Sequence, residues 1–398
     1  MKRFLQLAII CLTFAAVFAG CKAGQQGAQG PAGQSGAPGP QGTAGAPAPV
    51  TPGAGLKATI TRVDVGADRK VTVSYKLTDE AGTPVSRSLL DANSERFSIA
   101  RLSVDSATQY SSWLSYVVVD VKGVAFKLNG KDTQPALAEA KGVPVTAADT
   151  AGEYKEVGPG QYTYTMKTVL PDGFDKTATH RVMYQGTRNA RVYLANATLD
   201  FVPAGGDVKT TRQVVATENC NKCHDPLVIH GARYDTKLCV VCHTPQNVEP
   251  NSGNVLDFKV FVHKIHDAEN LPSVKSGKPY FVTNSNHDFS DVALPQDVRN
   301  CTTCHSNAPN WKTAPSRAAC GSCHDNIDWA TGKSAISGRR DHLGGPQKDD
   351  TTCKGCHQPD SGQEFDASVV GAHTIPATRR TAPSATFSRP THCLCLTV

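Results

Sequence analysis

The most chemically informative residues of this chain are cysteines that recur in pairs with a histidine directly after them. The pattern Cys-x-x-Cys-His occurs five times between residues 220 and 357. Two thiols at this spacing can add to the two vinyl groups at one edge of a porphyrin, and the adjacent histidine can then bind the iron. The motifs therefore predict five c-type haems. The attachment residues are Cys220, Cys223, Cys239, Cys242, Cys301, Cys304, Cys320, Cys323, Cys353 and Cys356, and the proximal iron ligands are His224, His243, His305, His324 and His357.

Three other uses of paired cysteines fit the sequence less well. Disulfides and zinc hooks do not require a histidine after each pair, and with 13 histidines in 398 residues five of five would arise by chance with a probability of roughly 4 × 10⁻⁸. Zinc sites also join such hooks two by two, so that five leave one over. A redox dithiol is expected as a single motif in a βαβ setting, which this sequence lacks. We therefore expect haem, and we assign no catalytic residue.

The ligand on the other face of each iron decides between electron transfer and substrate binding. None of the three methionines lies in the half that carries the motifs, so methionine ligation within that half is excluded. Six histidines between Cys220 and His373 lie outside the motifs, one more than five irons need. His263 and His266 are three residues apart and therefore share one face of a short helix, where each could serve a different haem. The candidates for distal ligation are His230, His263, His266, His342 and His373, with His287 in reserve.

The N-terminal segment indicates export and a lipid anchor. Residues 1–20 have a basic start, an apolar run and small residues before Cys21, which is the layout of a lipoprotein signal peptide. Cys21 is the expected site of lipidation, with plain secretion as the alternative, and Lys22 in place of Asp favours the outer membrane. Glycine then recurs at every third position from 24 to 45, so residues 21–55 are predicted to form a lipidated, collagen-like stalk.

Residues 56–205 carry the pattern of an all-β domain. Apolar residues alternate with polar ones in segments 71–77 and 162–166, as expected for strands with one buried face. Glycine-containing turns separate these segments. We predict a β-sandwich or split barrel that is followed by a second, different domain.

Residues 206–376 are predicted to be a multihaem cytochrome c domain of short helices and loops. Apolar periodicity fades here, and five haems in so short a segment must themselves supply most of the buried apolar surface. Residues 206–398 hold 20 Lys and Arg against 19 Asp and Glu. This near-neutral balance offers no basic stripe, so nucleic acid is not an expected partner.

Several stretches together resemble the OmcA/MtrC family of outer-membrane decahaem cytochromes of metal-reducing bacteria. They are the lipobox, the glycine-rich stalk, "CHDPLVIHGARYDTKLCVVCHTPQN", "VHKIH" and "GAHTIP", and the resemblance covers about residues 1–376. It implies a split β-barrel followed by a pentahaem domain, which is the N-terminal half of such a cytochrome. It also implies two histidine ligands on each iron, with the distal ligands carried onto His230, His263, His266, His342 and His373.

The resemblance further implies a multihaem electron carrier. It would conduct electrons from the outer membrane to iron(III) or other metal oxides, soluble shuttles or partner cytochromes, by outer-sphere transfer. The expected partners are other multihaem cytochromes or a porin–cytochrome conduit, and the expected place is the cell surface, with the periplasmic face of the outer membrane as an alternative. Two other functions stay open: a multihaem reductase with one open iron, and an adhesive collagen-like surface protein.

Residues 377–398 depart from the family pattern. After "AHTIP" family members continue into a second β-domain and a second pentahaem set, whereas this segment is basic and lacks Cys-x-x-Cys-His. We expect an aberrant, disordered tail and a shortened chain.

Overall fold

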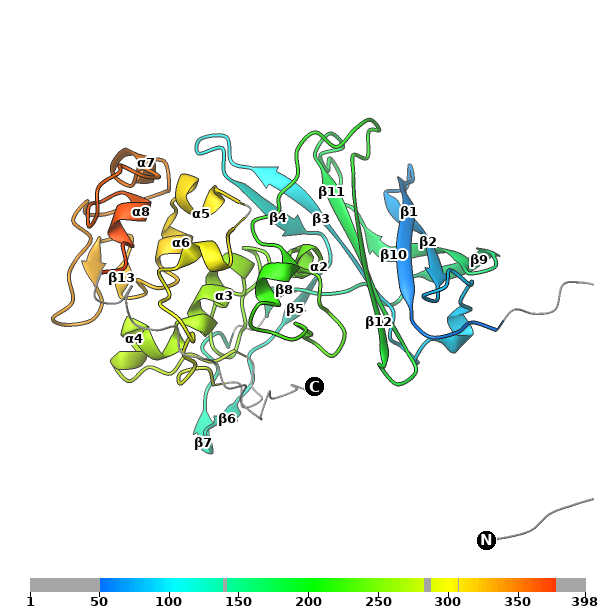
Figure 1. The fold of residues 1–398 in the computed structure, drawn as a ribbon, viewed down its shortest axis with the longest axis horizontal. Coiled ribbons are helices and arrows are strands. Elements are labelled where there is room, and N and C mark those ends of the chain that lie inside the picture. Colours follow the sequence, from blue (N-terminus) through cyan, green and yellow to red (C-terminus); the bar gives the residue numbers. More distant parts are fainter. Residues whose placement is uncertain (1–50, 139–141, 283–287, 307, 377–398) are drawn as a thin grey trace, which may run out of the picture. The chain divides into compact units, whose positions relative to one another are not determined.

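Two antiparallel sheets of four strands each form the first part of the structure (Figure 1). The computed structural model describes residues 51–138, 142–282, 288–306 and 308–376, and all of these residues belong to one compact unit. The strand order of sheet A is β1 (Lys57–Val65), β2 (Lys70–Thr78), β10 (Gln161–Val169) and β9 (Glu153–Gly158). The strand order of sheet B is β12 (Tyr193–Phe201), β11 (His180–Arg188), β3 (Arg96–Val104) and β4 (Ser111–Ser115).

The apolar residues that alternate along the strands form the core between the two sheets. On β2 the buried positions are every second residue, beginning at Val71. Tyr75 and Leu77 are at most 1% exposed. The side chains that meet them include Tyr162, Tyr164, Phe97, Ile99, Val182 and Tyr184. The predicted all-β domain is therefore confirmed, and its core consists of its own side chains.

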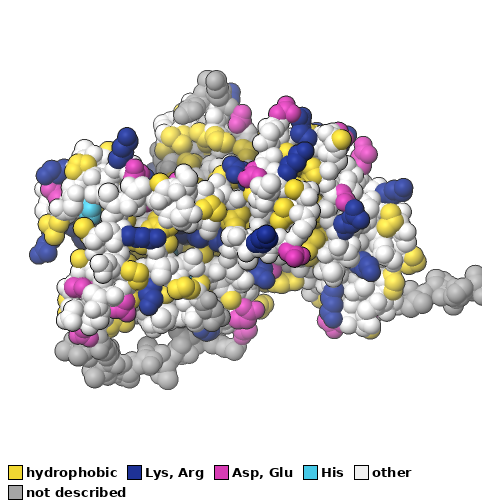
Figure 2. Space-filling model, turned by 90° about the horizontal axis from the view of Figure 1, so that it is seen from above, with side chains coloured by type: hydrophobic (Ala, Val, Ile, Leu, Met, Phe, Trp, Pro, Cys, Tyr) yellow, Lys and Arg dark blue, Asp and Glu magenta, His cyan; other side chains and the backbone are white. Residues whose placement is uncertain are grey.

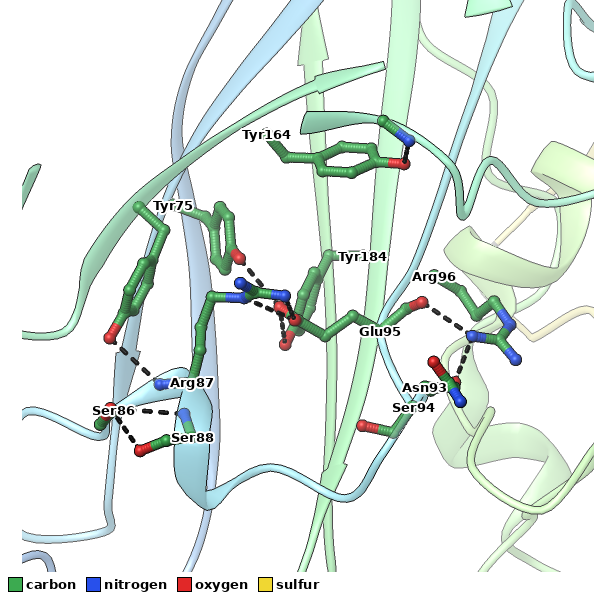
Figure 3. Close-up of polar contacts among 12 residues, drawn as sticks. Tyr75, Ser86, Arg87, Ser88, Asn93, Ser94, Glu95, Arg96, Tyr164 and Tyr184 are labelled. Carbon is green, nitrogen blue, oxygen red and sulfur yellow. Dashed lines mark hydrogen bonds and ion pairs between the residues drawn. The ribbon is translucent and has the colours of Figure 1, made fainter. Parts of the chain in front are cut away.

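A buried carboxylate joins the two sheets within this core (Figure 3). Glu95 accepts a hydrogen bond of 2.8 Å from the Tyr75 hydroxyl of sheet A and one of 3.3 Å from the Tyr184 hydroxyl of sheet B. The Arg87 guanidinium donates to the same carboxylate at 2.7 Å. A buried charge is tolerated only when it is paired and hydrogen-bonded, and Glu95 meets both conditions.

Sheet B is buried on both faces, whereas an alternation of apolar and polar residues predicts strands with one buried face. Its outer face packs against α2 (Thr236–Cys242), a helix that carries the second Cys-x-x-Cys-His motif. The cluster consists of Ala100, Leu102, Trp113 and Met183 from the sheet and Leu238, Val241 and Cys242 from the helix. A segment predicted to attach haem is thus part of the same packed structure as the sandwich.

An arm between β4 and β9 also reaches the second part of the chain. It contains the strand pairs β5 (Val118–Val121) with β8 (Val143–Thr146) and β6 (Phe126–Leu128) with β7 (Lys131–Thr133). The backbone N–H of Val124 donates to Asn251 Oδ1 at 2.8 Å, and that of Ala136 donates to the Asn251 carbonyl at 2.8 Å. The predicted domain boundary near residue 205 stays a prediction, since contacts cross it at several places.

Residues 206–376 consist of short helices joined by loops. The helices are α1 (Thr217–Cys220), α2, α3 (Phe258–His266), α4 (Pro272–Lys275), α5 (Asn310–Thr313), α6 (Arg317–Cys320), α7 (Cys353–Cys356) and α8 (Val369–Ala372). The shorter elements are the 3₁₀ turns η1 (Arg87–Leu89) in the sandwich, η2 (Ala268–Asn270) and η3 (Cys301–Thr303), and the strand pair β13 (Ile327–Asp328) and β14 (Lys333–Ser334). Among the described residues of this part, the one apolar cluster separate from the sandwich is built around Ala268, Leu271 and Tyr280.

Several predictions concern residues outside the described ranges. They are the signal peptide, the lipidation site Cys21, the stalk up to residue 50, the reserve ligand His287 and the tail 377–398. Within the described part of the chain, no helix has the length and apolar character needed to cross a bilayer. On the face drawn in Figure 2, Lys and Arg side chains are interspersed with Asp and Glu side chains.

Candidate haem sites

Each Cys-x-x-Cys-His motif is wound into a single helical turn. The backbone N–H of the motif histidine donates to the carbonyl of the first cysteine in all five motifs, at 2.9 to 3.0 Å. This i to i−4 bond brings the two cysteines onto one side of the turn and leaves the histidine at its end. Side-chain caps start two of these turns, because Asp235 accepts from the N–H of Lys237 ahead of α2 and Ser316 accepts from that of Ala319 ahead of α6.

Every motif histidine faces one histidine from outside the motifs. We number the sites 1 to 5 by the order of their motifs. The pairs, with the distances between ring centroids, are His224 with His266 at 6.1 Å, His243 with His230 at 6.2 Å, His305 with His263 at 6.0 Å, His324 with His373 at 6.5 Å, and His357 with His342 at 6.2 Å. Two metal–nitrogen bonds of about 2 Å, with about 1.1 Å from each nitrogen to its ring centre, require about 6 Å. The spacing therefore suits one iron between the rings of each pair.

Hydrogen bonds at Nδ1 make Nε2 the nitrogen that can bind a metal in most of the rings. In six of the ten rings Nδ1 lies 2.7 to 3.2 Å from a backbone carbonyl oxygen, which can only accept a hydrogen bond. Nδ1 therefore carries the proton, and the lone pair is on Nε2. The rings and their carbonyl partners are His243 with Leu256, His266 with Val262, His305 with Val214, His342 with Gly345, His357 with Ala367 and His373 with Val369. Such outer contacts are typical of metal-binding histidines.

Burial sets the protonation of two candidate ligand histidines and two motif cysteines. It lowers the pKa of His243 and of His263 to about 4 each, so both imidazoles are neutral at pH 7, as a metal ligand must be. Burial also raises the pKa of the Cys239 and Cys323 thiols to about 12. These cysteines are therefore not reactive thiolates at neutral pH, which argues against a redox dithiol.

One continuous cavity joins all five sites. Its volume is about 2870 Å³, several times the 300 to 1,000 Å³ of an ordinary ligand pocket. Its walls include all ten motif cysteines, the five motif histidines and the five histidines that face them. The described cysteines are all free of disulfides, and no three or more His, Cys, Asp or Glu among the described residues converge as a site for a bare metal ion. The residues present fit five porphyrins.

Neighbouring sites are tied together by side chains. Helix α3 carries His263 of site 3 and His266 of site 1 one turn apart. Asn219, which is 6% exposed, donates to the Cys304 carbonyl at 2.8 Å and accepts from the Ser306 hydroxyl at 3.0 Å, so it joins motif 1 to motif 3. The N–H of Thr236 donates to Thr217 Oγ1 at 3.0 Å, which joins the helices of motifs 2 and 1.

Two further contacts connect the remaining sites. The Ser322 hydroxyl, inside motif 4, lies 3.3 Å from Nδ1 of His263, the candidate distal ligand of site 3. Arg317 at the start of α6 donates to Asp350 at 2.8 Å, three residues before motif 5. The contacts thus connect the sites in the order 2, 1, 3, 4, 5.

The structure brings together the predicted proximal and distal histidines, but the pairing and the linking residues were not foreseen. His266 faces a motif histidine 42 residues earlier, and His373 faces one 49 residues earlier. The spacing of His263 and His266 was the one signal that two sites share a helix. Nothing in the sequence marked Asn219 as a link between motifs.

Comparison with known proteins finds that the chain is similar to multihaem cytochromes. Residues 212–369 match the family model for domains II and IV of outer-membrane cytochromes of the MtrC/MtrF type. A curated relative, the multihaem cytochrome MtrC of Shewanella baltica, is 29% identical over 239 residues, which are 54% of this chain and 30% of the relative.

Two solved structures share the fold. The outer-membrane decahaem cytochrome OmcA matches with a TM-score of 0.62 and 23% identity over 80% of this chain and 48% of that one. MtrC of Shewanella baltica matches with a TM-score of 0.50 and 24% identity over 77% of this chain and 43% of that one. The chain thus spans less than half the length of these relatives.

Proposed function

We propose that the chain is a member of the OmcA/MtrC family of outer-membrane multihaem cytochromes and that it conducts electrons to extracellular acceptors through five bis-histidine c-type haems. The observation that carries this proposal is the set of five histidine pairs at 6.0 to 6.5 Å around one cavity. Each pair includes the histidine of one attachment motif. The proposed haem count and ligation both follow from this repeated arrangement.

Two imidazoles on each iron favour an electron carrier over a reductase. Bound haem supplies a redox centre that takes up and releases one electron, and a second histidine closes the face on which a substrate would bind. The chain's own residues supply neutral imidazoles, fix the orientation of six rings through carbonyl hydrogen bonds and hold neighbouring attachment turns together. A multihaem reductase would instead need one open iron.

The contacts between sites support a continuous path in the order 2, 1, 3, 4, 5. Each link is a hydrogen bond or a shared helix between segments that carry cysteines or candidate ligands. Electron transfer between haems is fast only when the rings are held close together. These links hold neighbouring sites close together. The proposed acceptors are metal oxides, soluble shuttles and partner cytochromes.

Intact mass and ferric electron paramagnetic resonance (EPR) of the mature protein test the haem proposal together. We expect a mass that includes five haem increments and a spectrum of low-spin iron with two histidines. A smaller number of increments would refute the count. A large high-spin signal, or carbon monoxide binding at most of the irons, would refute bis-histidine ligation and favour the reductase.

The proposed location is the outer membrane at the cell surface, with Cys21 as the lipid anchor and a porin–cytochrome conduit as the electron donor. The lipobox around Cys21 and the outer-membrane family support it. Replacing Cys21 with Ser should release haem-stained protein from the membrane fraction, and protease added to intact cells should cleave the wild-type chain. Protein that resists protease until the outer membrane is opened would indicate the periplasmic face instead.

A further inference from the structure

We propose that two side chains of the β-sandwich, Asn196 and Gln185, are positioning residues for the distal ligand of site 2, so that the sandwich decides whether this iron is closed. The inference rests on the proposed function, in which His230 and His243 share one iron. It goes beyond that function because it assigns a task to the domain that has no cysteine and no predicted ligand. It also singles out one of the five irons.

The distal histidine of site 2 lies in a tight loop with unfavourable backbone conformation. His230 has φ of 52° and Gly231 has φ of 71°, so two successive residues are left-handed. Ile229 and Arg233 close the loop with two backbone hydrogen bonds of 2.8 Å. A left-handed conformation costs little for glycine but is unfavourable for histidine. The loop therefore needs support from outside to hold the histidine in place.

That support comes from β12. The Asn196 amide donates to the Ala232 carbonyl at 2.8 Å, and its Oδ1 accepts from the N–H of Tyr234 at 2.9 Å and of Asp235 at 3.3 Å. The Asn196 N–H donates to the Tyr234 hydroxyl at 3.2 Å. One side chain thus holds the backbone directly after the left-handed pair.

A second contact comes from β11. Gln185 lies opposite Asn196 in the register of sheet B, so the two side chains are on the same face of the sheet. Gln185 Oε1 accepts from Arg233 Nε at 2.7 Å. Arg233 lines the cavity together with Cys239 and His243, so this contact also directs a positive charge toward site 2. Asn196 and Gln185 themselves are not part of the cavity wall.

The hairpin turn between these strands closes against the same loop. Arg191 lies in this turn, and a Cβ added to Gly231 would come within 2.6 Å of its Nη1 atom. A side chain larger than hydrogen at position 231 would therefore require Arg191 to move. The turn therefore contributes a third contact between the sandwich and the loop that carries His230.

The other candidate distal ligands are held by the haem region itself. His263 and His266 lie on helix α3, and His373 follows α8, with its Nδ1 2.7 Å from the Val369 carbonyl. His342 has its Nδ1 2.9 Å from the Gly345 carbonyl, and its ring lies against Trp329. Among the described distal ligands, His230 is the one whose own loop is hydrogen-bonded to the sandwich. Loosening the sandwich contacts should therefore open site 2 and leave the other four sites closed.

The test compares Asn196→Ala, Gln185→Ala and the double variant in the purified, haem-loaded protein. We expect the double variant to convert about one fifth of the iron to a high-spin form that binds carbon monoxide. The single variants should convert less, and Asn196→Asp, which keeps the acceptor for Tyr234 and Asp235, should be closer to wild type. Added imidazole should restore the low-spin spectrum if the chain is folded and only a ligand has left.

The matched control is Asn251→Ala. Asn251 is a buried asparagine whose Oδ1 makes a long-range hydrogen bond, accepting from the N–H of Val124 at 2.8 Å, and like the half-buried Asn196 it lies outside the cavity wall. We expect this variant to stay fully low-spin. An equal amount of high-spin iron in the control would show that general destabilisation, and not the loss of the Asn196 and Gln185 contacts, opens site 2.

His230→Ala separates a failure of this inference from a failure of the proposed function. We expect this variant to show one high-spin haem in five. If it stays low-spin, the proposed ligand pairing at site 2 is wrong. If it becomes high-spin while the Asn196 and Gln185 double variant stays low-spin, the pairing stands and the role of the sandwich is overturned.

Discussion

The sandwich and the haem region of this chain are stabilised in different ways. Between the two sheets of the sandwich, apolar side chains and the satisfied carboxylate of Glu95 fill the interior. In the haem region, residues within 212–373 together with part of sheet B line a cavity of about 2870 Å³. The sandwich therefore folds around its own residues, whereas under the proposed function the haem region would fold around bound haems. The contact between α2 and sheet B joins the two regions.

The largest expected effect comes from preventing haem attachment. Replacing all ten motif cysteines with Ala should leave residues 206–376 without a core, because the separate apolar cluster found among their described residues is small. The sandwich should stay folded, since its main core lies between its own sheets. Limited proteolysis with mass spectrometry should recover a protected fragment near residues 56–205. Equal protection of residues 206–376 would show that this region does not need attached haem to fold.

The next largest effect is a loss of stability at the outer face of sheet B, where the sandwich packs against α2. Trp113 is 3% exposed and packs against α2, and the Arg181 guanidinium lies 4.4 Å from the centre of its ring. Trp113→Ala should lower the free energy of unfolding by about 3 to 5 kcal/mol, and hydrogen exchange should show faster opening of α2. Trp113→Phe keeps most of the contact and should lose less. Unchanged exchange at residues 236–242 in the alanine variant would show that α2 does not depend on this face.

A smaller loss in the free energy of unfolding is expected when Glu95 is replaced inside the sandwich. Glu95→Ala leaves the hydroxyls of Tyr75 and Tyr184 and the Arg87 guanidinium without their acceptor. We expect a loss of about 2 to 4 kcal/mol, less than for a fully buried pair because the Arg87 side chain is 31% exposed. The haem spectrum should not change. Chemical denaturation measures the loss.

The control for Glu95 is Asp64, whose pair with Arg62 lies at the surface. Asp64→Ala should change the stability by less than about 1 kcal/mol. A similar loss in both variants would mean that burial does not set the strength of these ion pairs.

A loss of stability smaller than that of the Glu95 variant is expected at the link between sites 1 and 3. Asn219→Ala removes the hydrogen bonds to Cys304 and Ser306, at a cost of about 1 to 2 kcal/mol. The irons should stay low-spin because no ligand is touched, but magnetic coupling between the two haems and electron transfer between them should weaken. EPR and photoreduction kinetics measure this, with Asn251→Ala as the control. Unchanged coupling would show that α3 alone fixes the spacing.

Local spacing made part of the site predictable. The bonds that fold a motif into one turn span four residues, so the positions of Cys220, Cys223 and His224 relative to one another depend on that segment alone. The same holds for alternation along β2, which marked Val71 to Leu77 as one buried face. Such patterns need no knowledge of the rest of the chain.

The pairing of irons and distal ligands needed the tertiary structure. Any of the spare histidines could have served any motif by sequence, since a flexible chain can close loops of many lengths at similar entropic cost. Packing selected one arrangement. Helix α3 lies between sites 1 and 3, so His266 and His263 face motif histidines on either side of it in the sequence.

The sequence by itself thus determined where haem attachment is predicted and which side of strands such as β2 is buried, because both depend on neighbours within a few residues. The tertiary structure decided which histidine faces which, that α2 covers the outer face of sheet B, and that β11 and β12 hold the loop of His230. These contacts join segments tens of residues apart, and their free energy exists only once the whole chain has packed.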